Sequence, residues 1–263
     1  MKALIRFAAT LGLVSSTMVG VVFGVSPNSM ALPETEVIDN LQGVPIYSIT
    51  DSEGLPLLTV RQGQEKGIAN LFLSLKDAEA AIEQLKQTNP DIAQEAQLVI
   101  VSLPDIYQKV KEASQQTDSP DFRFVPIQQE VNSAVSLLKQ QGQEVSQFRG
   151  VPLFFATVEV QREGQSEKQE IYLPAPGSDQ IPLFFEKEQA QKLAELFKQQ
   201  EPGMASDVQI RVLPLEYVIE LFENESGDAI KNMFLVRSQE AESLVQELLK
   251  QQEGGQPSNN PGN

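Results

Sequence analysis

The side chains that most often carry out catalysis are missing from this chain of 263 residues, because it contains neither histidine nor cysteine. Their absence removes the commonest general base, the commonest metal ligand and the thiolate nucleophile together. The chemistry left to an enzyme is that of carboxylates, or of a serine paired with a lysine. The composition excludes histidine-based triads and ordinary zinc sites, and we predict no catalytic residue, no metal and no cofactor.

One short motif has the spacing for serine–lysine chemistry. Ser136 and Lys139 match the Ser-x-x-Lys pattern of penicillin-interacting enzymes, but the Lys-Thr-Gly motif expected beside it does not occur in the chain. Leu138 belongs to the apolar stripe of the same predicted helix, so Lys139 continues its solvated face. We interpret the motif as part of a structural helix.

The carboxylates are numerous but scattered. Pairs such as Glu79 and Glu83 arise from the surface pattern of a helix without any catalytic need. The run from Glu223 to Asp228 offers oxygen ligands for calcium, yet it lacks the alternating ligand order of a known calcium loop, and we interpret it as an acidic surface turn. A carboxylate enzyme or a small-ligand receptor stays a third alternative, because the sequence does not locate any convergent buried acids.

The elements that would position any site are written twice in the chain. Residues 43–141 recur as residues 150–252, and from Leu71 to Val110 the copies align without a gap at an offset of 112. The unit is too long for a solenoid repeat, which spans about 20–50 residues. We therefore predict two similar halves related by a pseudo-two-fold axis.

Each copy predicts the same order of strands and helices. Proline after Gly-Val can start a strand, so residues 46–50 and 153–158 are the expected first strands. In the first copy two further strands, 57–60 and 68–73, complete a three-stranded meander, and Ser74 caps the following helix. A strand, a short helix, a closing strand and a last helix follow in both copies. The expected fold class is α/β, of the α+β type, with a mixed sheet packed with helices in each lobe.

Three apolar runs, at residues 71–73, 153–155 and 183–185, are the sharpest remaining feature. Alternation along a strand cannot place three consecutive side chains on one face of a sheet. Either each sheet is buried on both faces, or one face is partly open and forms a pocket for apolar segments of client proteins. The residues that we predict for such client-binding pockets, which are ordinary core residues in the first interpretation, are Ile46, Leu71, Leu73, Leu153, Leu183 and Phe185.

The first thirty-one residues have the features of a secretory signal. Lys2 and Arg6 precede an apolar stretch from Phe7 to Val25, and small residues up to Ala31 suit cleavage after that residue. The alternative is an uncleaved membrane anchor, but glycine, serine and threonine lower the hydrophobicity of this stretch. Because an exported chain without cysteine has no disulfides, the bacterial periplasm fits best, with the thylakoid lumen as the alternative.

The excess of acidic over basic residues limits the kinds of partner that the chain can bind. The chain has a net charge of −16, and the expected signal holds two basic residues and no acid. Such a surface repels phosphate backbones and anionic headgroups, so we predict no nucleic acid and only peripheral membrane contact. The domains expected from these patterns are a signal peptide at 1–31, a first lobe at 32–142, a second lobe at 143–252 and a disordered tail at 253–263.

Taken together, several blocks of the chain resemble the Tic22-like family, which is named for a soluble component of the plastid protein-import machinery and is also present in cyanobacteria. The blocks that carry the resemblance are residues 43–47, 71–74 with Asp77 and Ala78, 101–107, 124–126, 148–154 and 182–185. The resemblance implies a butterfly-like α/β protein of two lobes, located between two membranes.

The resemblance also implies a role, but no catalytic signature. It implies a chaperone-like factor in protein translocation and outer-membrane protein biogenesis, with precursor or outer-membrane proteins as partners and an outer-membrane assembly machine as a further one. The alternative is a non-catalytic adaptor that links inner- and outer-membrane translocation components. Suppression of the aggregation of a denatured outer-membrane protein distinguishes the two.

Overall fold

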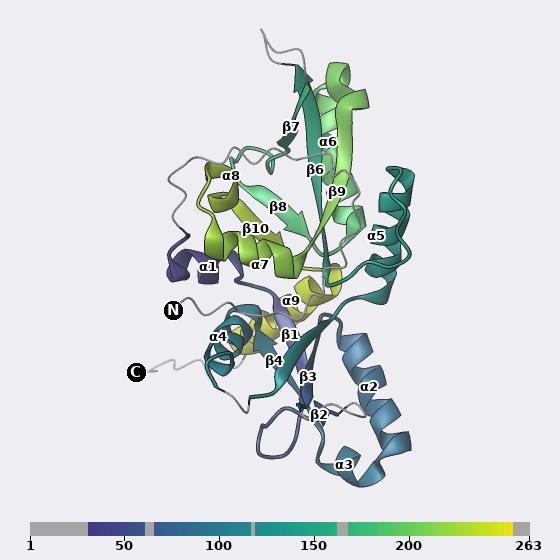
Figure 1. Ribbon diagram of the computed structural model, residues 1–263, viewed down its shortest axis with the longest axis vertical. Helices are drawn as coiled ribbons and strands as arrows, with labels where there is room; N and C mark the ends of the chain where they lie inside the picture. The colour runs from purple at the N-terminus through teal and green to yellow at the C-terminus, as the bar shows by residue number, and fades with distance from the viewer. Residues whose placement is uncertain (1–30, 61–65, 117–118, 162–167, 255–263) are drawn as a thin grey trace, which may run out of the picture.

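A computed structural model describes residues 31–60, 66–116, 119–161 and 168–254 of the chain. These residues form two mixed β-sheets, each with helices packed against both faces (Figure 1). The fold class is the one that the sequence predicts. The expected signal peptide and most of the expected tail lie outside the described residues.

The first sheet is built around the antiparallel pair of its first and third strands. β1 pairs antiparallel with β3 and with β4, while β5 pairs parallel with β3. A short strand, β2, extends the sheet along β3. The strands are β1 (Pro45–Thr50), β2 (Leu58–Thr59), β3 (Ile68–Phe72), β4 (Gln97–Ser102) and β5 (Asp121–Val125).

The second sheet repeats this pairing. β6 pairs antiparallel with β8 and with β9, and β10 pairs parallel with β8, as β5 does with β3. β7 differs from β2, because it pairs with β6, the first strand of its sheet. The strands are β6 (Pro152–Gln161), β7 (Lys168–Tyr172), β8 (Ile181–Phe184), β9 (Val208–Pro214) and β10 (Met233–Val236).

Most of the helices fall into equivalent pairs, while α1 in the first half and α8 in the second half have no counterpart. α2 corresponds to α6, α4 to α7 and α5 to α9. The short helix α3 follows α2, and a 3-10 turn at Pro202–Asp207 follows α6. The helices are α1 (Glu34–Asn40), α2 (Leu75–Thr88), α3 (Pro90–Glu95), α4 (Leu103–Ala113), α5 (Gln128–Gln140), α6 (Lys187–Gln200), α7 (Leu215–Asn224), α8 (Asp228–Lys231) and α9 (Gln239–Gly254). Within the described part of the chain, none of these helices is long and apolar enough to cross a membrane.

The local signals of the repeat are confirmed. Pro45 and Pro152 are the first residues of β1 and β6, and the Ser74 hydroxyl accepts a hydrogen bond from the Asp77 amide at the start of α2. The expected meander is wrong, because β3 pairs directly with β1 and β2 lies beyond the end of that pairing. The side chains of β2 are exposed, so no apolar burial holds this segment between the other two strands.

The apolar runs alternate between two cores. Leu71 belongs to a large core that faces α4 and α7, whereas the next residue, Phe72, faces the opposite side of the sheet. In the second sheet Leu153 likewise faces the large core, and the next residue, Phe154, faces the opposite side of the sheet. Each run is therefore split by the pleat, as the alternation requires. The large core includes buried side chains from both sheets, so the two halves share one apolar interior.

The last helix of each half packs against the other half. α5 contacts β6, β9 and α6, and its Ala134 and Leu137 are buried in the outer core of the second sheet (Figure 1). Conversely, Leu244 of α9 packs with Tyr47 and Phe72 on the outer face of the first sheet. The two halves exchange these helices, so neither sheet is covered by its own half alone.

A buried hydroxyl distinguishes the two outer cores. Tyr47 is fully buried, burial raises the pKa of its phenol to about 12, and its hydroxyl has no hydrogen-bond partner among the described residues. Its counterpart in the second half is Phe154, also fully buried. Because an unsatisfied buried hydroxyl is costly, we expect Tyr47→Phe to raise the free energy of unfolding in urea by about 1 kcal/mol. The reverse change, Phe154→Tyr, should lower it, and a loss of stability in Tyr47→Phe would contradict this interpretation.

Candidate functional site at the junction of the two halves

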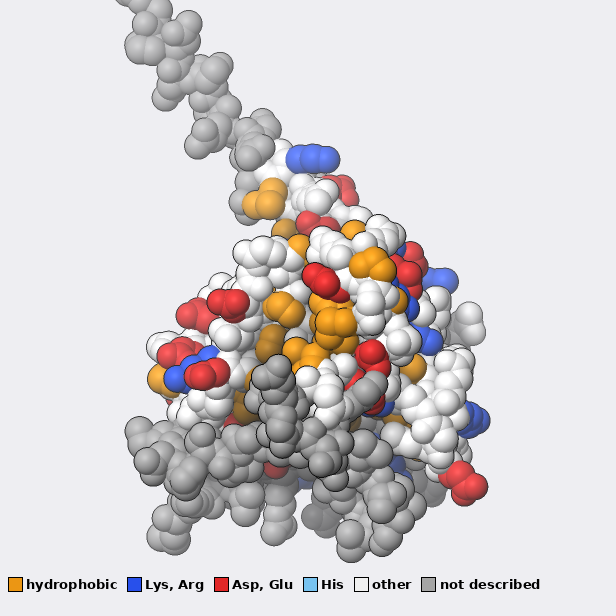
Figure 2. All heavy atoms as spheres, turned by 90° about the horizontal axis from the view of Figure 1, so that it is seen from above, with side chains coloured by type: hydrophobic (Ala, Val, Ile, Leu, Met, Phe, Trp, Pro, Cys, Tyr) orange, Lys and Arg blue, Asp and Glu red, His pale blue; other side chains and the backbone are white. Residues whose placement is uncertain are grey.

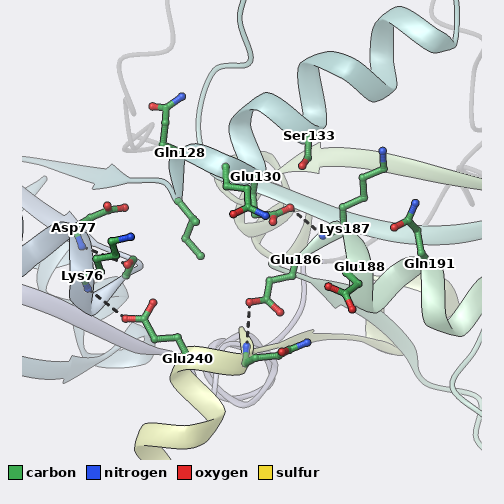
Figure 3. A pocket seen from close by; sticks show the side chains of 14 residues that line it. Lys76, Asp77, Gln128, Glu130, Ser133, Glu186, Lys187, Glu188, Gln191 and Glu240 are labelled. Atoms are coloured by element: carbon green, nitrogen blue, oxygen red, sulfur yellow. Dashed lines mark hydrogen bonds between the residues drawn. The ribbon is translucent and has the colours of Figure 1, made fainter.

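Four helices begin around one cavity where the halves meet. The first turns of α2, α5, α6 and α9 line a cavity of about 680 Å³ (Figure 3). The amino end of a helix carries unpaired amide groups and a partial positive charge, so it favours carboxylates nearby. The acidic residues that line the cavity are Asp77, Glu130, Glu186, Glu188 and Glu240.

Two of these carboxylates cross from one half to the other. Glu130 of α5 accepts a hydrogen bond from the Lys187 amide at the start of α6, with a distance of 3.0 Å. Glu240 of α9 accepts one from the Leu75 amide at the start of α2, with a distance of 2.6 Å. Figure 3 shows the contact of Glu130 with Lys187 and, on the other side of the cavity, the hydrogen bond that the Lys76 amide also donates to Glu240. The exchanged helices are thus each tied to the helix that they reach by a carboxylate in their first turn.

A third carboxylate connects the start of α6 to the start of the exchanged helix α9. Glu186, which precedes α6, accepts a hydrogen bond from the Gln239 amide at the start of α9, with a distance of 3.2 Å. In the first half the equivalent position is Ser74, which caps its own helix. The junction is therefore a chain of helix caps that runs from α5 to α6, from α6 to α9 and from α9 to α2.

Burial sets the ionisation of these groups. It is the largest cause of the raised pKa of Glu130, and it also raises the pKa of Glu186, although each carboxylate accepts a backbone hydrogen bond that lowers it. The neighbours that face the pair are Lys187, which lowers the pKa of Glu130, Lys192, which lowers that of Glu186, and Glu188, which raises both. Ionised carboxylates are therefore costly at the junction.

These raised pKa values predict that the fold gains stability on mild acidification. A carboxyl whose pKa is higher in the folded chain than its ordinary value of 4.5 stabilises the fold when protonated. That contribution is fully present below pH 4.5 and is lost as the pH rises through the folded pKa. We expect a larger free energy of unfolding in urea near pH 5 than near pH 7.5.

A double variant separates the junction from the charge of the whole surface. Glu130→Gln with Glu186→Gln keeps an acceptor oxygen on each side chain, so the caps can remain while the titration is removed. The pH dependence of the unfolding free energy should then become flatter, and an unchanged slope would contradict the assignment to these groups. Glu130→Ala, which also removes the cap of α6, should cost about 1 kcal/mol at neutral pH.

The arrangement gives these carboxylates a joining role. Glu130, Glu186 and Glu240 each accept an amide of a helix end, which is the structural use of a carboxylate at this position. The Ser-x-x-Lys motif lies elsewhere on α5, where Ser136 donates to the carbonyl oxygen of Asn132 and Lys139 is exposed. We interpret the cavity as the joint between the halves.

The structure places all six predicted client-binding residues in the shared core. Each is less than 5% exposed, and the structure brings them together from both sheets into one cluster. Contact with a client at these side chains requires the core to open, so their binding role stays a prediction. The residues are Ile46, Leu71, Leu73, Leu153, Leu183 and Phe185.

The surface combines acid with scattered apolar side chains. The chain has 36 acidic and 20 basic residues. Figure 2 shows apolar side chains gathered at the centre of the face seen from the β7 end of the molecule, with carboxylates around them. The large apolar side chains that are most exposed are Leu55, Leu58, Val60, Ile92, Ile100, Leu196, Tyr217 and Leu249.

Sequence reasoning missed the junction and α1. Glu130 and Glu240 stand at equivalent positions of the two copies, which is a visible signal of a shared role. Their partners are 57 and 165 residues away, so no local pattern shows which helix each one caps. α1 lies before the repeat begins, and only its alternation of acidic and apolar residues could have indicated it.

Comparison with known proteins places this fold. The model of the Tic22-like family matches residues 2–243. A curated relative, the chloroplastic TIC 22-like protein of Arabidopsis thaliana, is 24% identical over 155 residues, which are 59% of this chain and 44% of the relative. The match therefore spans less than half of the length of that relative.

Solved structures agree with the family match. Tic22 of Anabaena, described as a protein-transport protein, has a TM-score of 0.68 and 26% identity, and the match covers 82% of this chain and 97% of that one. Tic22 from Plasmodium falciparum has a TM-score of 0.56 and 19% identity over 84% of this chain and 99% of that one, and it shows the shared fold. The fold defines a two-sheet α/β protein whose halves are joined at the helix ends. The chain belongs to the Tic22-like family.

Proposed function

We propose that this protein is a non-catalytic, chaperone-like factor of protein transport. It works in the periplasm, or in a compartment descended from it, and holds apolar segments of outer-membrane precursors during their passage. The observation that carries the proposal is the structural likeness to a solved protein whose description is protein transport. The match covers 82% of this chain and 97% of that protein. The features of a secretory signal at residues 1–31 support the compartment.

The physical character of the chain suits such a role. Apolar segments of a client bind through burial of apolar surface, at about 25 cal/mol per Å², without any need for nucleotide or metal. A net charge of −16 keeps a loaded complex soluble and opposes self-association. The same charge disfavours nucleic acid and anionic lipid as partners. The partners that the family resemblance implies are precursor proteins and the assembly machinery that receives them.

A direct test is light scattering during dilution of a urea-unfolded outer-membrane barrel protein into buffer. We expect the chain without residues 1–31 to suppress the scattering at near-equimolar amounts, because client surface is covered before it associates. A globular protein of matched size and net charge serves as the control for nonspecific effects of an acidic protein. Scattering as high as in that control would overturn the holding function.

The failure of that test would favour the second candidate. An adaptor between inner- and outer-membrane translocation components binds folded partners and leaves unfolded chains alone. The acidic surface then supplies the contact, and binding to an isolated outer-membrane assembly component should weaken as the salt concentration rises. The two candidates are thus separated by the state of the protein that each one binds.

A further inference from the structure

α1 is a helix that the repeat does not need. It comes before the Gly-Val-Pro step of the first half, and the corresponding segment of the second half, residues 141–147, contains no helix. The second sheet nevertheless forms the same strand pairings as the first. α1 is therefore an addition to the common unit, and the surface that it covers indicates what it does.

The surface on which α1 lies, here called its seat, is formed by α4, α7 and β10, and so by both halves. α1 contacts α4 of the first half and α7 and β10 of the second half (Figure 1). Leu32, Val37 and Leu41 point into the shared core and are 5%, 1% and 0% exposed. On the outer side Glu34, Glu36 and Asp39 are exposed, so the segment has the apolar and acidic faces of an amphipathic helix.

The attachment of α1 is mainly apolar. The backbone amides of Glu36, Val37, Leu41 and Gln42 donate to carbonyl oxygens within residues 33–39, so none of these hydrogen bonds attaches the segment to the rest of the chain. Among the described residues, one ion pair joins α1 to its neighbours, from Lys111 of α4 to Glu34 with a distance of 3.0 Å, and both side chains are about a third exposed or more. Such an exposed pair adds little.

The floor of the seat is held independently of α1. The Tyr107 hydroxyl of α4 donates a hydrogen bond to Glu223 of α7, with a distance of 2.9 Å, and so connects the two helices directly. Ile106, Val218 and Phe222, which are nearly or fully buried, belong to the core beneath. Removal of α1 therefore uncovers an apolar groove whose two walls remain connected.

We propose that the groove between α4 and α7 is a binding site for an amphipathic helical segment of a transported protein, and that α1 occupies it in the unloaded chain. The segment of α1 itself shows the chemistry of the occupant, which is a short helix with a buried apolar side chain, like that of Val37, and apolar residues at both ends, like Leu32 and Leu41. A client segment enters when α1 leaves, so release of α1 and capture of the client are coupled. The inference rests on the proposed holding function and assigns its site.

A reversible tether tests the coupling in the chain from residue 32 onward, with the expected signal removed. The chain has no cysteine, so Glu34→Cys with Lys111→Cys can be joined specifically by a reducible bis-maleimide. The probe is a labelled peptide with the sequence of residues 32–41, measured by fluorescence anisotropy. We expect the tethered chain to bind it about tenfold more weakly than the same chain after reduction.

A matched tether controls for the modification itself. Glu83→Cys with Lys86→Cys joins two exposed residues within α2, far from α1 in sequence, and should leave probe binding unchanged by reduction. Equal binding by the Glu34–Lys111 chain before and after reduction would overturn the assignment of the groove. Both positions in each tether are partly exposed, so the variants are expected to fold.

A second pair of variants loosens α1. Val37→Asp places a carboxylate on its buried face and should raise probe binding several-fold, whereas Thr35→Asp adds the same charge on the exposed face and should not. Val37→Asp should also suppress the scattering of the unfolded barrel protein at lower concentrations than the unmodified chain.

The outcomes separate the function from the site. If the unmodified chain suppresses scattering but the tether and Val37→Asp change nothing, the function stands and the groove is rejected. If no form suppresses scattering while the peptide binds as expected, the holding function fails and the groove remains as a helix-binding site.

Discussion

Separate expression of the two halves, residues 32–142 and 143–254, is expected to give two unfolded fragments that fold when they are mixed. Each sheet lacks one covering helix without the other half, because α5 and α9 are exchanged. The large core also takes its buried side chains from both sheets. Far-ultraviolet circular dichroism of each fragment alone and of the equimolar mixture is the measurement, and the mixture should regain the spectrum and the cooperative unfolding of the intact chain.

The matched control is the full chain with a protease site inserted between Gly142 and Gln143, which are exposed in the loop after α5. Cleavage there should leave one folded complex, since loops tolerate breaks better than the elements they connect. Cooperative unfolding of residues 32–142 alone would contradict the account, because it would show a lobe that is complete by itself. We therefore propose residues 32–142 and 143–252 as units of duplication, and the pair of exchanged helices as the contact expected from a pseudo-two-fold axis.

Gly150→Ala is expected to be among the most damaging single changes, at a cost of roughly 2–4 kcal/mol in the free energy of unfolding. Gly150 has a φ of +87°, in the left-handed region that disfavours any other residue. A Cβ atom there would also overlap the carboxylate of Glu216. That carboxylate accepts a hydrogen bond from the Val151 amide with a distance of 3.1 Å, at the start of the long central strand β6.

Gly142→Ala separates the two causes. Gly142 has a similar φ of +81°, but nothing lies within 4 Å of a Cβ at that position. It should therefore show only the backbone cost of about 1–2 kcal/mol. Equal losses for Gly142→Ala and Gly150→Ala in urea unfolding would show that the Glu216 side chain moves aside freely, and would contradict a packing role for the glycine in the second Gly-Val-Pro step.

Much of the fold follows from local signals in the sequence. Proline after Gly-Val marks the starts of β1 and β6, the three apolar runs mark strands with two buried faces, and Ser74 marks the start of α2. These features depend on backbone geometry and on neighbours within a few residues. The Gly-Val-Pro signal recurs in both copies, whereas the serine cap does not, because Glu186 stands at the position equivalent to Ser74.

The rest depends on contacts between distant residues. The pairing of β3 with β1 and the position of β2 are set by which strand finds an apolar partner, and the exposed Leu58 offers none. The crossing of Glu130 and Glu240 to the other half cannot be read from either copy, because each helix would look the same if it covered its own sheet. α1 has seven residues, too few for a periodic pattern to stand out.

The central claim is that client segments bind where α1 lies, and hydrogen–deuterium exchange during client binding tests it most directly. The amides of Val37 and Leu41 donate within the α1 segment, so they report whether this helix remains seated and folded. We predict that an unfolded outer-membrane barrel protein speeds exchange across residues 36–42 and slows it in α4 and α7. Client binding with the exchange of residues 36–42 unchanged would contradict the account.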